Sequence, residues 1–563
     1  MLSGLTVPQA FADSDTSCSG SGKYYLSNGV VFRPSPAPPV QCSGEVVLDT
    51  SVVQIGANAF RGLYGITKIT LPERLTTISS FAFTGARSLA AISIPASVTS
   101  IGTNVFSGTS SLQSFVVASS NMNYSVVNGA LFNKNQSVLI AYPAANPQTS
   151  FTIPNGVTTI SSTAFLGATN LTSITIPSSV TTIGESAFSG ATSLTSITIP
   201  AAVTSIGASV LDGTSSLTSI TIASANQNYT VSDGALLNKS KTLLLGFPVK
   251  SLQKSFTLPD TVVRIEASMF KDAKNLVSLT LGKSLEFIGD GAFEGDSSLT
   301  AITIPSSVTS IGNHVFYSTP ALTAIDVDST NGFYCSVSGV LFDKDKVSLE
   351  SYPASNPAKS FSLPSTLSEI ADFALADVKN VESISLEPGN SSFVLENGAL
   401  LDREKTKIIF YSRNNTNSTF KLPNTVLKVS EGAFSYAKNL TAFKVDEANA
   451  GFSTLDGVLF DKNAEMIIAY PSGSASSAYT IPSTVTGINV GAFTSSQFMT
   501  VVISDDADQA MLADSGLGSN VRVVTSSVYA EELIKAAAEL KAKQEAEANS
   551  LQKSLQQKSL QLS

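Results

Sequence analysis

The feature that most constrains this chain is a repeat. Residues 171–193 read LTSITIPSSVTTIGESAFSGATS, and LTSITIP follows again at once. Along most of the 563 residues, Ile-Pro or Leu-Pro steps recur at 23 residues, as from Pro72 to Pro95, or at 59, as from Pro95 to Pro154. The long step is the short one plus 36 residues. Two fixed periods predict a solenoid, in which each coil packs on its neighbours.

The 23-residue unit reads L-x-x-I-x-I-P-x-x-V-x-x-I-G-x-x-A-F-x-x-A-x-x. Its alternation predicts a strand that points Ile174 and Ile176 inward and Ser173 and Thr175 outward. A second short extended segment follows, and Gly184 is expected to allow a tight turn. A large apolar residue stands eleven residues after each step and is expected to fill one coil each: Phe60, Phe83, Phe106, Phe165, Phe188, Leu211, Phe270, Phe293, Phe316, Leu375, Phe434 and Phe493.

The 36-residue additions are also alike. Each alternates apolar and polar residues around a Gly and then a second turn, which predicts strands and a hairpin. An Asn three residues before an aromatic begins each one, and we interpret it as a turn residue. The five similar segments are 124–143, 229–248, 334–353, 393–412 and 452–471, and residues 24–32 are a partial copy.

The two ends differ from the repeats. Residues 1–12 end in a small-x-small pattern, which indicates the remnant of a signal peptide. Residues 13–45 are predicted to cap the first coil, with a disulfide between Cys18 and Cys42; the alternative is two unrelated thiols. Residues 505–526 are predicted to cap the last coil.

Residues 527–563 are rich in strong helix formers, and Ser526 or Ser527 can cap a helix there. Leu533, Ala537 and Leu540 form an intermittent apolar stripe. The segment is either an oligomerising helix or a solvated tail that packs weakly on the last coil.

The core IP-x-x-V-T-x-I-G-x-x-A-F resembles the BspA-like class of bacterial leucine-rich repeats over residues 46–504. The resemblance implies a right-handed leucine-rich-repeat solenoid with a parallel sheet on one face, interrupted by β-hairpin insertions. With the helix predicted from composition at the C-terminus, the expected fold is a mainly β solenoid followed by one α-helix. It also implies a secreted or cell-surface location and adhesion to host, matrix or neighbouring-cell ligands. The Cys that the class often has after A-F is replaced here, for example by Ala191 and Thr109.

Composition excludes several classes of partner. The net charge is −9 and no basic cluster occurs, so nucleic acid and anionic membranes are poor partners. No apolar run is long enough to span a membrane.

Catalytic and metal motifs are weak. The one histidine, His314, falls at a repeat turn without a nucleophile beside it. Residues 326–332 resemble a calcium loop faintly, but its Gly is one place late. Cys335 is expected to be a buried or half-buried thiol. We therefore predict no enzyme, no cofactor and no metal site.

The outward strand positions carry one surface pattern. Ser or Thr occupies them in most coils, which predicts a hydroxyl ladder of about 80 Å at the usual strand spacing. The pattern reflects either sheet propensity or a recognition face, since Thr pairs also stabilise sheets. An ice-binding array is disfavoured because the additions would break its lattice. The candidate ligand face is Ser173, Thr175, Ser196, Thr198, Ser219, Thr221, Thr280 and Thr303.

The sequence thus favours an extracellular or cell-surface protein that binds protein or glycan ligands. The alternative is a surface-layer or stalk protein that assembles through its C-terminal helix.

Overall fold

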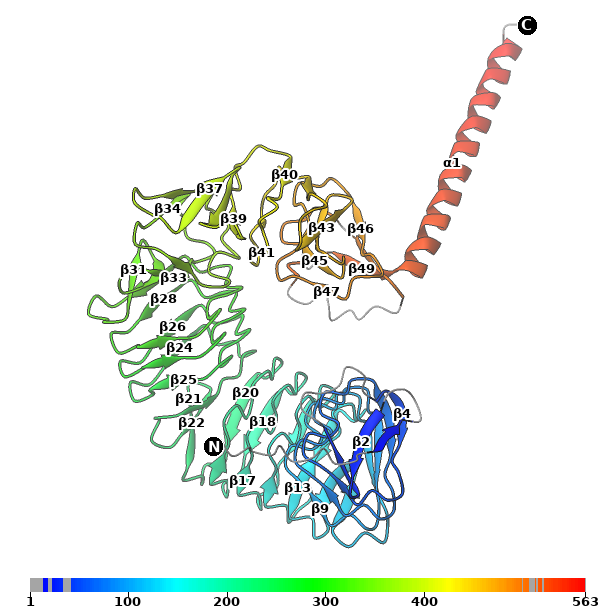
Figure 1. Ribbon diagram of the computed structural model, residues 1–563, viewed down its shortest axis with the longest axis vertical. Helices are drawn as coiled ribbons and strands as arrows, with labels where there is room; N and C mark the ends of the chain where they lie inside the picture. The colour runs from blue at the N-terminus through cyan, green and yellow to red at the C-terminus, as the bar shows by residue number, and fades with distance from the viewer. Residues whose placement is uncertain are drawn as a thin grey trace, which may run out of the picture. The chain divides into compact units, whose positions relative to one another are not determined.

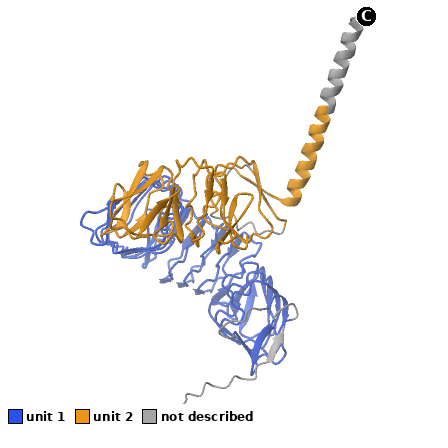
Figure 2. Ribbon diagram, turned by 45° about the horizontal axis from the view of Figure 1, so that its top comes forward, with its two compact units in different colours: residues 1–336 blue, residues 337–563 orange. Residues whose placement is uncertain are grey.

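The computed structural model describes residues 14–18, 23–33, 42–498, 500–505, 512, 515–518 and 521–561. The predicted signal-peptide remnant, residues 1–12, lies outside them. The chain divides into two compact units, Met1–Ser336 and Val337–Ser563 (Figures 1 and 2). Each unit is a stack of β coils, and the second ends in a helix.

Each coil of the first unit carries a long strand on one side. These strands pair in parallel within four separate sheets, at the 23-residue step, as Ser196 pairs with Ser219. They are β4 (Gly44–Val47), β6 (Ile66–Thr70), β8 (Ala91–Ile94), β10 (Ser114–Val117), β14 (Ser150–Thr152), β16 (Ser173–Thr175), β18 (Ser196–Ile199), β20 (Ser219–Ile222), β24 (Ser255–Thr257), β26 (Ser278–Thr280), β28 (Ala301–Ile304) and β30 (Ala324–Val327).

A second row of two-residue strands lies along another side of the coils. The strands are β5 (Gln54–Ile55), β7 (Thr77–Ile78), β9 (Ser100–Ile101), β15 (Thr159–Ile160), β17 (Thr182–Ile183), β19 (Ser205–Ile206), β25 (Arg264–Ile265), β27 (Phe287–Ile288) and β29 (Ser310–Ile311). They too pair in parallel, with Ile160 beside Ile183 and Ile183 beside Ile206. The mainly β solenoid predicted from the repeat is confirmed.

The predicted aromatic core is also confirmed. The ring centroids of Phe60 and Phe83 lie 5.5 Å apart, and those of Phe165 and Phe188 lie 5.2 Å apart, stacked in both pairs. All four rings are almost fully buried. One coil buries little apolar surface alone, so the stack of coils supplies the hydrophobic stabilisation.

Gly184 has a different role from the predicted tight turn. A Cβ on Gly184 would lie 2.3 Å from the backbone N of Ser162 in the preceding coil, so glycine is needed for close packing between coils. Positive φ falls instead at Ser186 (52°) and Gly190 (67°).

The additions supply more than a hairpin. Strands β11 (Tyr124–Val127) and β12 (Ala130–Asn133) form the predicted antiparallel hairpin, and so do β21 (Tyr229–Ser232) and β22 (Ala235–Asn238). A third strand, β13 (Val138–Ala141) or β23 (Leu244–Gly246), pairs with the hairpin through a bulge. Strand β13 then joins the row of short strands, with Leu139 beside Ile160. Each addition is therefore a turn of the solenoid as well as a hairpin.

A buried asparagine ties each hairpin to the preceding coil. Asn121 Nδ2 donates to the carbonyl oxygens of Pro95 (2.7 Å) and Val98 (3.1 Å), and its Oδ1 accepts from the backbone N–H groups of Asn123 and Tyr124. Asn226 repeats these four bonds in the second hairpin. The predicted structural role of this residue is confirmed.

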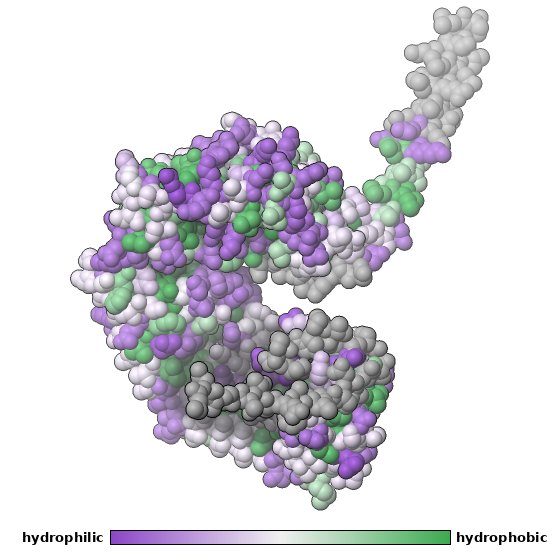
Figure 3. All heavy atoms as spheres, viewed as in Figure 1, coloured by the Kyte–Doolittle hydropathy of each residue, from purple (hydrophilic) through white to green (hydrophobic). Residues whose placement is uncertain are grey.

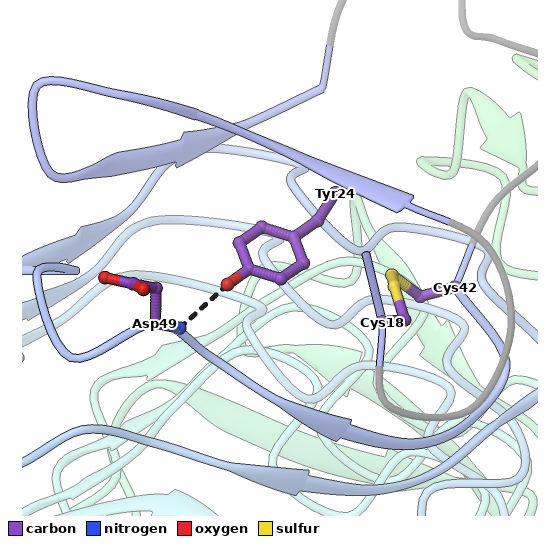
Figure 4. Close-up of a disulfide and its surroundings, with 4 residues drawn as sticks. All are labelled: Cys18, Tyr24, Cys42 and Asp49. Atoms are coloured by element: carbon purple, nitrogen blue, oxygen red, sulfur yellow. Dashed lines mark hydrogen bonds between the residues drawn. A yellow bond between two sulfur atoms is a disulfide. The ribbon is translucent and has the colours of Figure 1, made fainter. Parts of the chain in front are cut away.

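The N-terminal segment begins the stack. Strand β1 (Ser14–Ser17) pairs with β2 (Lys23–Ser27), β2 pairs with β3 (Val30–Phe32), and β3 joins the short-strand row at β5. A disulfide joins Cys18 and Cys42, whose Cα atoms lie 5.7 Å apart. Beside it, the backbone N–H of Asp49 donates to the hydroxyl of Tyr24 at 2.7 Å (Figure 4).

The second unit repeats the same elements. After β31 (Tyr334–Val337), which runs across the division, its strands are β32 (Val340–Asp343), β33 (Ser348–Ser351), β34 (Ser360–Leu363), β35 (Glu369–Ile370), β36 (Ser383–Leu386), β37 (Phe393–Glu396), β38 (Ala399–Asp402), β39 (Lys407–Tyr411), β40 (Thr419–Lys421), β41 (Lys428–Val429), β42 (Ala442–Lys444), β43 (Phe452–Leu455), β44 (Val458–Asp461), β45 (Met466–Ala469), β46 (Ala478–Thr480), β47 (Gly487–Ile488), β48 (Thr500–Ile503) and β49 (Arg522–Thr525).

Helix α1 (Ser526–Gln561) follows β49 directly. The Asp505 carboxylate accepts bonds from the backbone N–H and the hydroxyl of Ser527, both at 3.0 Å, and so caps the helix start. Leu533 (54% exposed), Ile534 (71%) and Leu540 (58%) leave apolar side chains in solvent, and Figure 3 shows apolar groups on the described part of the helix. Among the described residues, no helix combines the length and apolar character that crossing a bilayer requires.

Candidate functional site

The hydroxyl face is the set of strand residues predicted to face outward. All eight side chains are exposed, and the Oγ1 atoms of Thr198 and Thr221 lie 2.8 Å apart in neighbouring strands. The members lie on β16, β18, β20, β26 and β28: Ser173, Thr175, Ser196, Thr198, Ser219, Thr221, Thr280 and Thr303.

The predicted ladder, which only Lys421 was expected to interrupt, does not run along one sheet. Strands β10 and β14 belong to different sheets, and so do β16 and β18, and β20 and β24. At the first break, the backbone N–H of Phe115 in β10 donates to Gly129 O, in the turn of the inserted hairpin, at 3.1 Å. The hairpin turn therefore occupies a backbone N–H of β10 that would otherwise pair with the next long strand. The exposed hydroxyls therefore form short blocks, and the longest within one sheet is Thr257, Thr280 and Thr303 on β24, β26 and β28.

Two clefts that the sequence did not predict lie beside the hairpins of the first unit. The inserted coil at the first cleft has a shorter turn than the next coil. Leu139 and its core aromatic Tyr142 are three positions apart, whereas Ile160 and Phe165 in the next coil are five apart. Tyr142 nevertheless occupies the aromatic position, because its ring stacks on Phe165 at 5.1 Å. The turn of the inserted coil is thus two residues shorter than its neighbour.

The first cleft has a volume of about 500 Å³. The turn at residues 102–107 and the turn at 161–166 form its two sides, and Tyr142 lies between them. Thr163 Oγ1 and Asn104 Oδ1 meet across it at 3.2 Å. No charged side chain lines it.

Tyr142 is the unusual residue of the first cleft. Its side chain is 5% exposed, and its phenolic oxygen is buried without a hydrogen-bond partner among the described residues. Burial raises the pKa of Tyr142 to about 12, so the hydroxyl is neutral at physiological pH. A buried hydroxyl without a partner is costly to the stability of the fold.

The second cleft occupies the equivalent place, 105 residues later, and has a volume of about 210 Å³. Phe247 replaces Tyr142, Leu211 replaces Phe106, and Asp212 replaces Ser107. Glu266 and Lys271 also line it, and Lys271 Nζ lies 2.9 Å from Glu294 Oε1. Burial raises the pKa of Asp212. The two clefts share a backbone and differ in chemistry.

The residues considered for catalysis or metal binding do not assemble into a site. His314 is exposed at a turn with φ 41°, and its Nδ1 lies 3.8 Å from Glu294 Oε2. Asp328 Oδ1 accepts bonds from the backbone N–H and hydroxyl of Thr330, which closes a turn. Cys335 is half-buried and is not in a disulfide. Among the described residues, no group of three or more potential metal ligands occurs.

The second unit holds a buried arginine. Arg413 is 8% exposed, and its guanidinium lies over the rings of Tyr436 (4.5 Å) and Phe410 (5.4 Å). Burial lowers the pKa of Arg413 to about 10. The ring contacts are favourable cation–π interactions, and they give this side chain a structural role.

A family model described as BspA type leucine rich repeat region (6 copies) matches residues 42–146, 141–244, 247–336, 334–448 and 406–509. None of the curated proteins matches.

Solved structures of leucine-rich repeat proteins are similar to this chain at low identity. A leucine rich cell surface protein from Faecalibacterium prausnitzii A2-165 is 23% identical, with a TM-score of 0.41, over 68% of this chain and 96% of that one. A leucine-rich repeat protein from Eubacterium ventriosum ATCC 27560 is 19% identical, with a TM-score of 0.32, over 86% and 95%. The pneumococcal vaccine antigen PcpA is 16% identical, with a TM-score of 0.28, over 88% and 82%.

Proposed function

Since the chain belongs to the BspA-type leucine-rich repeat family, we propose that it is an extracellular or cell-surface binding protein. Its ligands are proteins or glycans of host, matrix or neighbouring cells. The observation that supports this most directly is the block of exposed, uncharged hydroxyls on β18 and β20, which the sheet holds in register. A surface that is rigid before binding loses little conformational entropy when it binds.

Binding is a better proposal than catalysis for this chain. Nucleophilic and acid–base mechanisms need a base beside its substrate or nucleophile. The one histidine, His314, lies exposed on a turn near Glu294 and lines neither cleft. The described residues offer surfaces instead.

The test is a binding panel for the full purified chain against immobilised matrix proteins and glycans. We expect saturable binding to at least one member, weakened by the combined T175K/T198K/T221K variant, because three long cations would cover the hydroxyl face. Thr204→Lys is the control, since Thr204 is exposed but lies outside the long strands. An empty panel, or equal loss with the control, would contradict the proposal.

A second candidate function rests on helix α1. Its exposed Leu533, Ile534 and Leu540 favour assembly with another helix, as in a stalk or surface layer. Light scattering then shows an oligomer that dissociates when residues 527–563 are removed. A monomer at all concentrations would exclude this role.

A further inference from the structure

We propose that the first cleft, between the turns at 102–107 and 161–166, is a binding site for a neutral saccharide. This rests on the proposed function only in that the chain binds its ligand without transforming it. None of the eight residues of the hydroxyl face lines the cleft, so the two surfaces are separate.

Size is the first argument. Sites for small molecules usually have volumes of roughly 300–1,000 Å³. The first cleft, at about 500 Å³, falls in that range, whereas the second, at about 210 Å³, falls below it.

The lining determines the chemical class. Ser80, Thr103, Ser107 and Ser161 bring hydroxyls, and Asn104 and Asn133 bring amides. Hydroxyls and amides both donate and accept hydrogen bonds, which matches the hydroxyl groups of a sugar. A charged ligand would lose hydration in this cleft without meeting an opposite charge, so an ionic ligand is disfavoured.

The same cleft also has apolar walls. Ile101, Ile140 and Leu166 line it together with the aromatic rings of Phe106 and Tyr142. Sugar rings present C–H groups on one face and hydroxyls around the edge, so they fit a site with both kinds of wall. A single apolar or polar peptide side chain matches only the apolar wall or only the polar wall.

Tyr142 gives the cleft an aromatic wall. Its hydroxyl is buried away from solvent, so the side chain can offer a ligand only its ring. The Thr163 and Asn104 side chains meet across the cleft at 3.2 Å and join its two sides. A sugar in the cleft packs its C–H face on an aromatic ring and bonds to the polar groups of the two turns.

The second cleft provides the matched contrast within the same chain. It lacks the phenol, because Phe247 stands there, and it carries Asp212, Glu266 and Lys271 where the first has Ser107, Ser161 and Leu166. Its residues are compatible with the shared backbone. Residues of the second cleft can therefore replace their counterparts in the first cleft while the fold is kept.

The experiment is saturation-transfer NMR with the full chain and free sugars: D-glucose, D-galactose, D-mannose, N-acetyl-D-glucosamine, lactose and maltose. N-acetylneuraminic acid is the anionic control. We expect saturable signal from at least one neutral sugar and none from the anionic one. Y142F removes only the buried hydroxyl and keeps the ring, so it should leave sugar binding unchanged. Y142F/S161E/L166K, which copies three residues of the second cleft, should abolish binding.

Two controls separate a lost site from a lost fold. The thermal midpoint of Y142F should not fall, because phenylalanine stands naturally at the equivalent position 247. T175K/T198K/T221K should keep full sugar binding. The proposal is overturned if no neutral sugar saturates, if the triple cleft variant binds as the parent does, or if N-acetylneuraminic acid binds equally well. Binding to the matrix panel that persists without any sugar binding refutes the cleft site and leaves the proposed function intact.

Discussion

The two clefts of the first unit share one scaffold and differ in what lines it. Both lie where an inserted coil makes its turn two residues shorter than its neighbours do, and both lie beside a hairpin that a buried asparagine anchors. The first is neutral and about 500 Å³, whereas the second is charged and about 210 Å³. The comparison teaches that a few side chains change the volume and the charge of a cleft on one shared backbone.

The scaffold itself is the first part of this comparison to test. Asn121→Ala and Asn226→Ala each remove four hydrogen bonds to backbone groups, and both side chains are at most 2% exposed. Because the orphaned groups stay buried, we expect the free energy of local opening to fall by about 3 kcal/mol in each variant. Native-state hydrogen exchange of β11–β12 and β21–β22 measures it.

The exposed neighbours Met122→Ala and Gln227→Ala are the controls for that measurement. Met122 is 77% exposed, so its loss should change little. A large effect at Asn121 with none at Asn226 would show that the two hairpins are not held alike.

The second prediction concerns the apolar wall, where Phe106 of the first cleft corresponds to Leu211 of the second. Phe106 stacks on Phe83 at 6.0 Å and meets Phe115 edge-on at 4.8 Å, whereas Leu211 stands in its place at the second cleft. Phe106→Leu should therefore lower the opening free energy near β10 by about 1.5 kcal/mol, through lost ring contacts and burial. Hydrogen exchange of the β10 amides checks this. Unchanged protection would mean that the ring contacts contribute nothing to stability.

Much of the fold was predictable because the same pattern of apolar and polar positions recurs in each 23-residue unit. The inward position of Ile174, the outward position of Thr175 and the stacked Phe188 follow from alternation and from the 23-residue period. Asn121 was readable as a turn residue because its counterparts all stand three residues before an aromatic.

The clefts were not predicted, for a physical reason. The extra 36 residues look like an appendage when they are counted between prolines, yet β13 takes the place of a short strand and Tyr142 takes the place of a core phenylalanine. The pairing register of the coils decides which residues take these places, and the spacing between prolines does not reveal that register. The signal available was the distance from Leu139 to Tyr142, which is two residues shorter than from Ile160 to Phe165.

The phenol at the base of the first cleft gives a reciprocal test. Tyr142→Phe removes a buried hydroxyl that lacks a partner, so the opening free energy of β13 should rise by about 1 kcal/mol. Phe247→Tyr buries a new one and should lower that of β23 by a similar amount. Thermal midpoints and hydrogen exchange report both. A stabilising Phe247→Tyr would mean that the second cleft already offers the hydroxyl a partner.

The smallest expected effect concerns the acid of the second cleft. Burial raises the pKa of Asp212 above its usual 3.8. Its ionised form is therefore disfavoured in the folded state, and at pH 7 this lowers stability. Asp212→Ser, which copies Ser107, should raise the opening free energy at pH 7 by less than about 1 kcal/mol, since solvent and Lys271 already offset part of the cost.

The gain from Asp212→Ser must depend on pH in a definite direction. As the pH falls through the raised folded-state pKa, Asp212 takes up its proton in the fold before it would in the unfolded chain, so the parent recovers the lost stability. Below 3.8 the carboxyl is protonated in both states, and the electrostatic gain disappears. Ser107→Asp in the first cleft should cost more at pH 7 than Asp212→Ser gains, because Leu166 replaces Lys271 and no cation attracts the new carboxylate. Hydrogen exchange at pH 4 and pH 7 measures both variants, and equal and opposite effects would show that Lys271 contributes nothing to the second cleft.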